Sequence, residues 1–165
     1  MRSYLKYSVL IVLGLFALAK LAFGANLPDI SGLSQDTQLS IKMACALEKT
    51  EGPAKYGDCI TKQIEQLRLT PGIPDISGLS RDTQLSIKMA CALEKTEGPA
   101  KYTDCILQQF IKLSQSPGIP DISSLSQDTQ LSIKMACALE KTQGPVNYGS
   151  CIALHLRSIG VDPSY

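Results

Sequence analysis

The cysteines are the residues in this sequence whose type and spacing most clearly could do chemistry. A pair separated by 14 positions occurs three times: Cys45 and Cys59, Cys91 and Cys105, Cys137 and Cys151. Such pairs can form structural disulfides, exchange disulfides with a substrate or hold a metal ion. The Cys-x-x-Cys spacing typical of redox proteins is absent, and a metal site would need ligands from two pairs or from His155, the single histidine. The spacing favours structural disulfides, with redox or metal chemistry as the alternative.

Other candidates for catalysis are few. The chain contains three copies of one segment, described below, and His155 stands where the two earlier copies have glutamine. A lone histidine beside a helical face is usually not a base. The acidic residues also recur, in the first copy as Asp29, Asp36, Glu48, Glu51 and Asp58. They are interpreted as a solvated helix surface. We therefore predict a non-enzymatic protein without catalytic, cofactor-binding or metal-binding residues.

Composition excludes some partners. Residues 25–165 contain 13 basic and 15 acidic groups, which gives a net charge of −2. Aromatic residues make up 5% of the 165-residue chain, and tryptophan is absent. Neither a basic surface nor aromatic stacking platforms dominate, so nucleic acid is not expected as a partner.

One unit of 46 residues is written three times, over residues 28–73, 74–119 and 120–165. In each we predict two helices, over residues 35–50 and 53–69 in the first unit. Ser34 is a good N-cap, Gly52 ends the first helix, and Pro53 suits the first position of the second. In an antiparallel hairpin that turns there, Cys45 and Cys59 come level and can bond. Closing this loop should stabilise the fold by about 3 kcal/mol.

The expected architecture is all-α: three tandem disulfide-stapled helical hairpins. Apolar residues follow one face of the second helix at Tyr56, Ile60 and Ile64, and the tyrosine is expected in the core. The first helix is apolar on two sides. Leu39 and Met43 lie on one side, and Ile41 and Cys45 lie on the other. One side can pack on the second helix of the same hairpin and the other on a neighbouring unit, so the units either stack or form beads on linkers.

The repeated segment Pro-Asp-Ile-Ser-(Gly/Ser)-Leu-Ser opens every unit. It is loop-like, so it can bind a partner. The interpretation we favour is a fixed linker whose Ile30 and Leu33 cover the hairpin.

The N-terminus predicts export. Arg2 and Lys6 precede a run of 12 apolar or small residues, which is too short to span a bilayer and is typical of a secretory signal peptide. We expect cleavage after Gly24, which gives a signal peptide over residues 1–24. The alternative is an uncleaved membrane anchor over residues 5–25.

The string Leu33-Ser34, Ser40-Ile41, Ala44-Cys45, Lys49, Gly52-Pro53, Tyr56, Cys59 resembles a short two-cysteine repeat of exported bacterial proteins with no assigned function. The resemblance implies a periplasmic or cell-surface location and no particular activity. There is also a distant likeness to twin-cysteine helical hairpins of the mitochondrial intermembrane space, which have two cysteine pairs per hairpin and no secretory start.

These observations predict a periplasmic or secreted module that binds protein or acts as a scaffold. The alternatives are a thiol-disulfide or metal-handling envelope protein and a secreted enzyme inhibitor. A membrane contact is expected only if the N-terminal segment stays uncleaved. The sequence predicts neither the partner nor the oligomeric state.

Overall fold

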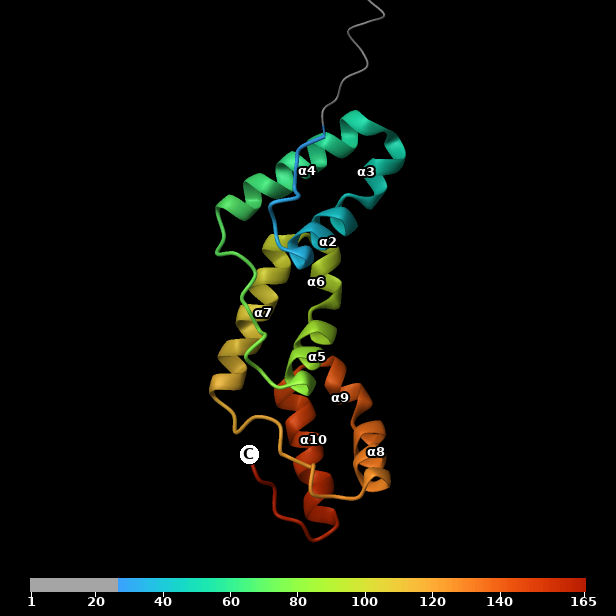
Figure 1. Ribbon diagram of the computed structural model, residues 1–165, viewed down its shortest axis with the longest axis vertical. Helices are drawn as coiled ribbons and strands as arrows, with labels where there is room; N and C mark the ends of the chain where they lie inside the picture. The colour runs from blue at the N-terminus through green and yellow to red at the C-terminus, as the bar shows by residue number, and fades with distance from the viewer. Residues whose placement is uncertain (1–26) are drawn as a thin grey trace, which may run out of the picture.

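The computed structural model describes residues 27–165, and every regular element in that range is an α-helix. The three units follow one another along an elongated molecule, the first at the top of Figure 1 and the last at the bottom. The predicted all-α architecture of three disulfide-stapled hairpins is confirmed. The helices are α2 (Gln35–Ala44), α3 (Ala46–Glu51), α4 (Pro53–Arg68), α5 (Arg81–Ala90), α6 (Ala92–Glu97), α7 (Pro99–Ser114), α8 (Gln127–Ala136), α9 (Ala138–Thr142) and α10 (Pro145–Ser158).

The residues at the helix ends explain where each hairpin begins and turns. The Ser34 hydroxyl accepts a hydrogen bond from the Thr37 amide at 3.2 Å, and so satisfies an amide that the first turn leaves free. Gly52 has φ +118°, a conformation that residues with a Cβ rarely adopt, and Pro53 is the first residue of α4. The other two units repeat both features.

The prediction of one continuous first helix is wrong. Its arm is divided at Cys45, whose φ of −103° and ψ of 18° depart from helical values. The Cys45 amide still bonds to the Ile41 carbonyl at 3.0 Å, so the arm changes direction without losing that hydrogen bond. The same break occurs at the bridged cysteine of the other two units, Cys91 and Cys137.

Each hairpin has a small core of its own, closed by a disulfide. In the first unit Ile41, Cys45 and Ile60 are buried, with Tyr56 and Ile64 packed against them. The predicted intra-unit bridges are present, with Cα–Cα separations of 5.7–5.8 Å: Cys45–Cys59, Cys91–Cys105 and Cys137–Cys151. Because a 46-residue unit buries little apolar surface, these bridges supply an important part of its stability.

The Pro-Asp-Ile segments cover these cores, as the favoured interpretation expected. Ile76 and Ile122 are buried in the cores of their own units, and Ile30 and Leu33 pack against the first core. The Asp29 carboxylate accepts the Ser31 amide at 2.8 Å and so fixes the turn of the segment.

None of the described helices is long and apolar enough to cross a membrane. The expected signal peptide, with its cleavage position, lies outside the described residues. Disulfides persist in oxidising compartments, and the three bridges are consistent with an oxidising environment outside the cytosol.

Candidate functional site

The hairpins are stacked, and the turn end of each packs against the two arms of the hairpin before it. Helix α2 contacts α6 and α7, and α4 contacts α7; one unit on, α5 contacts α9 and α10, and α7 contacts α10. Figure 1 shows the turn between α6 and α7 beneath α2, and the turn between α9 and α10 beside α5. The choice between stacked units and beads on linkers is thereby decided in favour of stacking.

Polar groups make the contact at each junction. The Ser40 hydroxyl donates to the Lys95 carbonyl oxygen at 2.8 Å, and the Lys95 ammonium donates to the Asp36 carboxylate at 2.7 Å. Ser40 is fully buried, and Lys95 lies over the Tyr102 ring at 5.0 Å from its centroid. The second junction has both hydrogen bonds at the same distances, formed by Ser86, Asp82 and Lys141.

A glycine lets the turn of the second hairpin approach the first. A Cβ at Gly98 would collide with the side-chain amide of Gln63, which is buried in the junction. Gly144 meets Gln109 in the same way at the second junction. Gly52 has the same conformation, but no atom of residues 27–165 lies near its Cβ position.

The first helix contributes mainly polar groups to the junction, and its second apolar side is covered only in part. Leu39 and Met43 are 48% and 38% exposed, and Leu47 is more exposed still. The turn of the next hairpin presents a backbone carbonyl and a lysine, and these need hydroxyl and carboxylate partners. Ser40 and Asp36 meet that need, although Asp36 was interpreted as part of a solvated helix surface.

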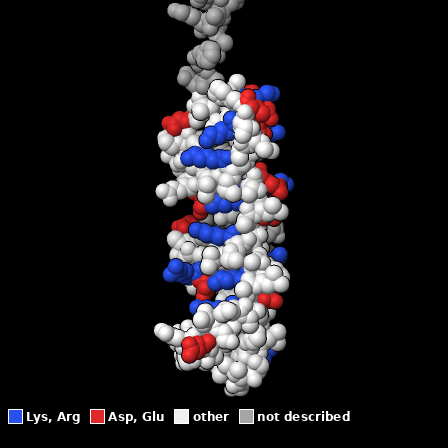
Figure 2. Space-filling view, turned by 90° about the vertical axis from the view of Figure 1, so that its right-hand side faces the viewer, with Lys and Arg blue, Asp and Glu red and all other residues white. Residues whose placement is uncertain are grey.

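Charges accompany the junctions along one face of the molecule. Figure 2 shows basic side chains at intervals along the long axis with acidic ones between them. Asp36 lies between Lys95 and the more distant Lys88, at 4.0 Å. Burial acts to raise the pKa of the equivalent Asp82, but the ammonium groups of Lys141 and Lys134 together outweigh it and hold that pKa below its usual value.

Each junction also forms a groove beside the Pro-Asp-Ile segment of the following unit, and the two grooves are equivalent. Their volumes are about 330 Å³ and 380 Å³. The first is bordered by Asp36, Asp75 and Lys88, and the second has their counterparts Asp82, Asp121 and Lys134. Both grooves therefore offer carboxylates and an ammonium group in the same arrangement.

The loop aspartates of the grooves are held as carboxylates. The backbone amide of Ser77 donates to Asp75 at 2.9 Å, and that of Ser123 donates to Asp121 at 2.8 Å. These amide bonds, helped by the serine hydroxyls, lower the pKa of both carboxyl groups. Each groove consequently remains charged well below neutral pH.

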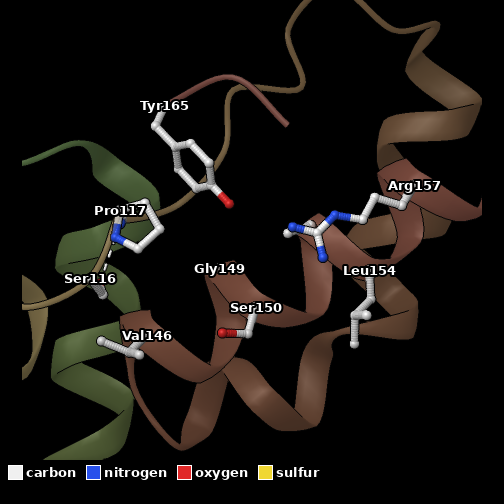
Figure 3. A pocket seen from close by; sticks show the side chains of 10 residues that line it. Ser116, Pro117, Val146, Gly149, Ser150, Leu154, Arg157 and Tyr165 are labelled. Atoms are coloured by element: carbon white, nitrogen blue, oxygen red, sulfur yellow. Dashed lines mark hydrogen bonds between the residues drawn. The ribbon is translucent and has the colours of Figure 1, made fainter. Parts of the chain in front are cut away.

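A third cavity, of about 350 Å³, lies where the last unit meets the linker that precedes it. It lies between α10, the preceding linker and the C-terminal tail, where Gly149 closely approaches the Gly118 carbonyl. Figure 3 shows the Tyr165 ring and the Arg157 guanidinium on opposite sides of the opening. The earlier units have no arginine at the position of Arg157, and isoleucine takes the place of Tyr165.

The structure places His155 beside the third disulfide. One ligand atom each of Cys137, Cys151 and His155 lies within 4.8 Å of the others. While the two sulfurs are bonded to each other they offer no thiolate, which is the form of cysteine that binds metal. The bridged cysteines therefore act as staples in this structure.

The fold and its junctions define a stacked α-helical repeat protein with one disulfide in each unit. Comparison with known protein families, curated proteins and solved structures found no match to the chain.

Sequence reasoning found the cysteines, the caps and the core tyrosines, but not the groups that join the units. Its best available signal was Ser40, a hydroxyl between Leu39 and Ile41 in an otherwise apolar stretch. A buried hydroxyl needs a hydrogen-bond partner. Nothing in the sequence identifies that partner as a backbone carbonyl 55 residues away.

Proposed function

We propose that the protein is an exported, non-enzymatic interaction module that holds a protein partner in its two inter-repeat grooves at once. The observation that carries the proposal is the repetition of one groove at both junctions, with two carboxylates and one lysine at matching positions; the second groove has Arg81 in addition. Two linked weak contacts bind far more tightly than either alone, because the second contact forms at a high effective concentration.

The chemistry of the grooves favours a polar, extended segment of a protein. Each groove has an apolar floor that includes Ile76 or Ile122 and carries charges of both signs at its edge. A chain with alternating basic and acidic side chains would match both the carboxylates and the lysine.

Binding fits these groups better than catalysis does. Asp75 and Asp121 are occupied by the amides that fix their loops. Asp36 and Asp82 are engaged by lysines of the following unit. A general acid or base must be able to release or take up a proton in reach of a substrate. Carboxylates held in their charged form serve recognition instead.

The test is capture of partners from an envelope extract by the exported protein and by groove variants. Lys88→Gln and Lys134→Gln each remove the lysine charge of one groove, while Arg81 stays in the second groove and the Lys95 and Lys141 pairs that join the units remain. Lys42→Gln is the matched control, since Lys42 occupies the same repeat position but borders neither of the two grooves. We expect each single groove variant to weaken capture and the double variant to weaken it by more than tenfold.

One result would contradict the proposal. If the double variant captures the same proteins as the control Lys42→Gln, in the same amounts, the grooves are not the binding surface. Capture that persists but depends on the third-unit cavity, through Arg157→Gln, would move the site to that cavity.

The position of His155 favours a second candidate, a thiol or metal-handling function. Reduction of Cys137–Cys151 would place two thiolates beside an imidazole, and these three ligand types bind zinc. Zinc binding by the reduced protein, lost in His155→Gln, would support it. A third bridge that stays intact at envelope redox potentials would exclude it.

A further inference from the structure

The two ends of the stack are the two unpaired halves of the junction that the molecule forms internally. Each internal junction joins the arms of one hairpin to the turn end of the next. Among the described residues, the arms of the last hairpin meet no following turn, and the turn of the first hairpin meets no preceding arms. We call these the arm face and the turn face.

The arm face is centred on Asp128 and Ser132, the counterparts of Asp36 and Ser40. Helix α8 has the same ten residues as α2. Ser40 and Ser86 are fully buried by the next hairpin, whereas Ser132 is exposed and no described residue bonds to its hydroxyl. Met135 shows the same difference, with 69% exposure against 38% for Met43.

The turn face is centred on Lys49, Gly52 and Pro53. Pro99 and Pro145, the counterparts of Pro53, are fully buried at the internal junctions, but Pro53 is exposed. Gly52 has φ +118°, close to +122° and +113° at the two internal turns. The turn therefore already has the backbone conformation that the junction requires.

The two faces carry opposite charges. Lys49 makes no ion pair within the described residues, although its counterparts Lys95 and Lys141 each bind an aspartate at 2.7 Å. Asp128, the counterpart of those aspartates, also has no cationic partner in residues 27–165. A lysine at one end and a carboxylate at the other are thus left for the same pairing.

We propose that a second copy of this chain docks its turn face on the arm face of the first, and that the exported protein forms head-to-tail chains. The occupant is a second copy because the same interface is already built twice inside each molecule. The contact is heterologous, so each added copy exposes a new arm face or turn face and growth does not close. Among the positions at which the last arm differs from the earlier ones, His155 stands where Gln63 and Gln109 meet the glycine of the following turn, so its ring would lie against Gly52.

This assembly goes beyond the proposed function and does not depend on it. The ends of the stack contain residues that border neither groove. Loss of partner capture would leave assembly intact, and a monomeric protein could still capture a partner.

The test is sedimentation of the exported protein, after its N-terminus and three bridges have been verified by mass, from micromolar to millimolar concentration. We expect species of increasing length as concentration rises. Ser132→Arg places an unpaired guanidinium in the junction and should raise the concentration required for assembly about a hundredfold or more. Ser124→Arg adds the same charge to an exposed loop position of the same unit and should leave assembly unchanged.

A charge exchange separates this geometry from other modes of association. Lys49→Glu and Asp128→Lys each place like charges at the junction, so each variant alone should remain monomeric. In an equimolar mixture, each junction between one variant and the other pairs one lysine with one acidic residue, and assembly should return. Circular dichroism checks that both variants are folded.

Three results would overturn the proposal. The wild-type protein could sediment as a monomer at every concentration. It could assemble with Ser132→Arg and Ser124→Arg behaving alike. The mixture of the two charge variants could remain monomeric while both are folded.

Discussion

Replacing Gly98 by alanine tests whether the hairpins are stacked in solution as the structure describes. The strength of the experiment is its matched control, Gly52→Ala. Both glycines have nearly the same backbone conformation, with φ of +122° and +118°. Only Gly98 faces a neighbouring unit, at the side chain of Gln63.

The backbone cost should be the same for both variants. A residue with a Cβ in this region of φ and ψ is destabilised by about 1–3 kcal/mol. Gly98→Ala additionally forces the Gln63 amide out of a buried position, and such overpacking costs about 1–3 kcal/mol more. The extra loss of stability has an upper limit, because the hairpins separate once the energetic cost of the collision exceeds the free energy that the junction contributes.

The assay is chemical denaturation of both variants and of the wild type with their disulfides intact. We expect Gly98→Ala to lose about 1–3 kcal/mol more free energy of unfolding than Gly52→Ala. Removing the obstructing side chain should restore most of this difference, so Gln63→Ala and Gly98→Ala should show a favourable coupling in a double-mutant cycle. Equal losses for the two glycine variants, with no coupling to Gln63, would refute the stacked arrangement and indicate hairpins joined as beads.

Three further measurements test the staples, the junction and the buried tyrosines. Replacing Cys91 and Cys105 by alanine should lower the free energy of unfolding by about 3 kcal/mol, and an unchanged denaturation midpoint would show that this bridge contributes little. Ser86→Ala should cost about 1 kcal/mol because it removes a buried hydrogen bond to a backbone carbonyl, while Ser132→Ala, measured at low protein concentration, should cost almost nothing; similar losses would contradict the junction. Burial, together with the charge of a nearby aspartate, raises the pKa of Tyr102 and Tyr148 to about 12, whereas unfolded tyrosines ionise near pH 10. As pH rises, the tyrosines ionise first in the unfolded chain and stabilise that state, so the free energy of unfolding should fall between about pH 10 and pH 12. An ultraviolet titration in which every tyrosine of the native protein ionises near pH 10 would exclude this loss of stability.

The hairpin was predictable because its signals are local. A serine N-cap, a glycine with positive φ and a proline at the first helical position each act within a few residues of their own place in the chain. The disulfides were predictable for the same reason, since Cys45 and Cys59 become level once the turn at Gly52 is fixed. The tyrosines follow from the apolar face of the second helix.

The junction was not predictable because its partners are distant and polar. Asp36 in a first helical turn is explained completely by the helix dipole, so its pairing with Lys95 adds no visible pattern. Apolar periodicity is the usual guide to packing, and here it showed two apolar sides on the first helix but gave no sign of the contacts made by Ser40 and Asp36. The break at Cys45 also escaped prediction, since alanine, leucine and glutamate on its C-terminal side all favour a continuous helix.

The same duplication that built the internal junctions also determines the ends of the molecule. A unit that binds its own copy leaves one half of the contact free at each end, whatever the number of units. Repeat proteins usually block such ends with altered terminal units. Here the arm face keeps Asp128 and Ser132, and the C-terminal tail does not cover them: Ser164 accepts the amide of Asp121 beside the linker, and both arm-face residues stay exposed. The change most able to limit growth is therefore the histidine at position 155, where its ring must fit against a turn that elsewhere meets glutamine. His155→Gln should strengthen end-to-end assembly if the ring obstructs the contact. If it weakens assembly instead, the imidazole is a favourable part of the junction between molecules.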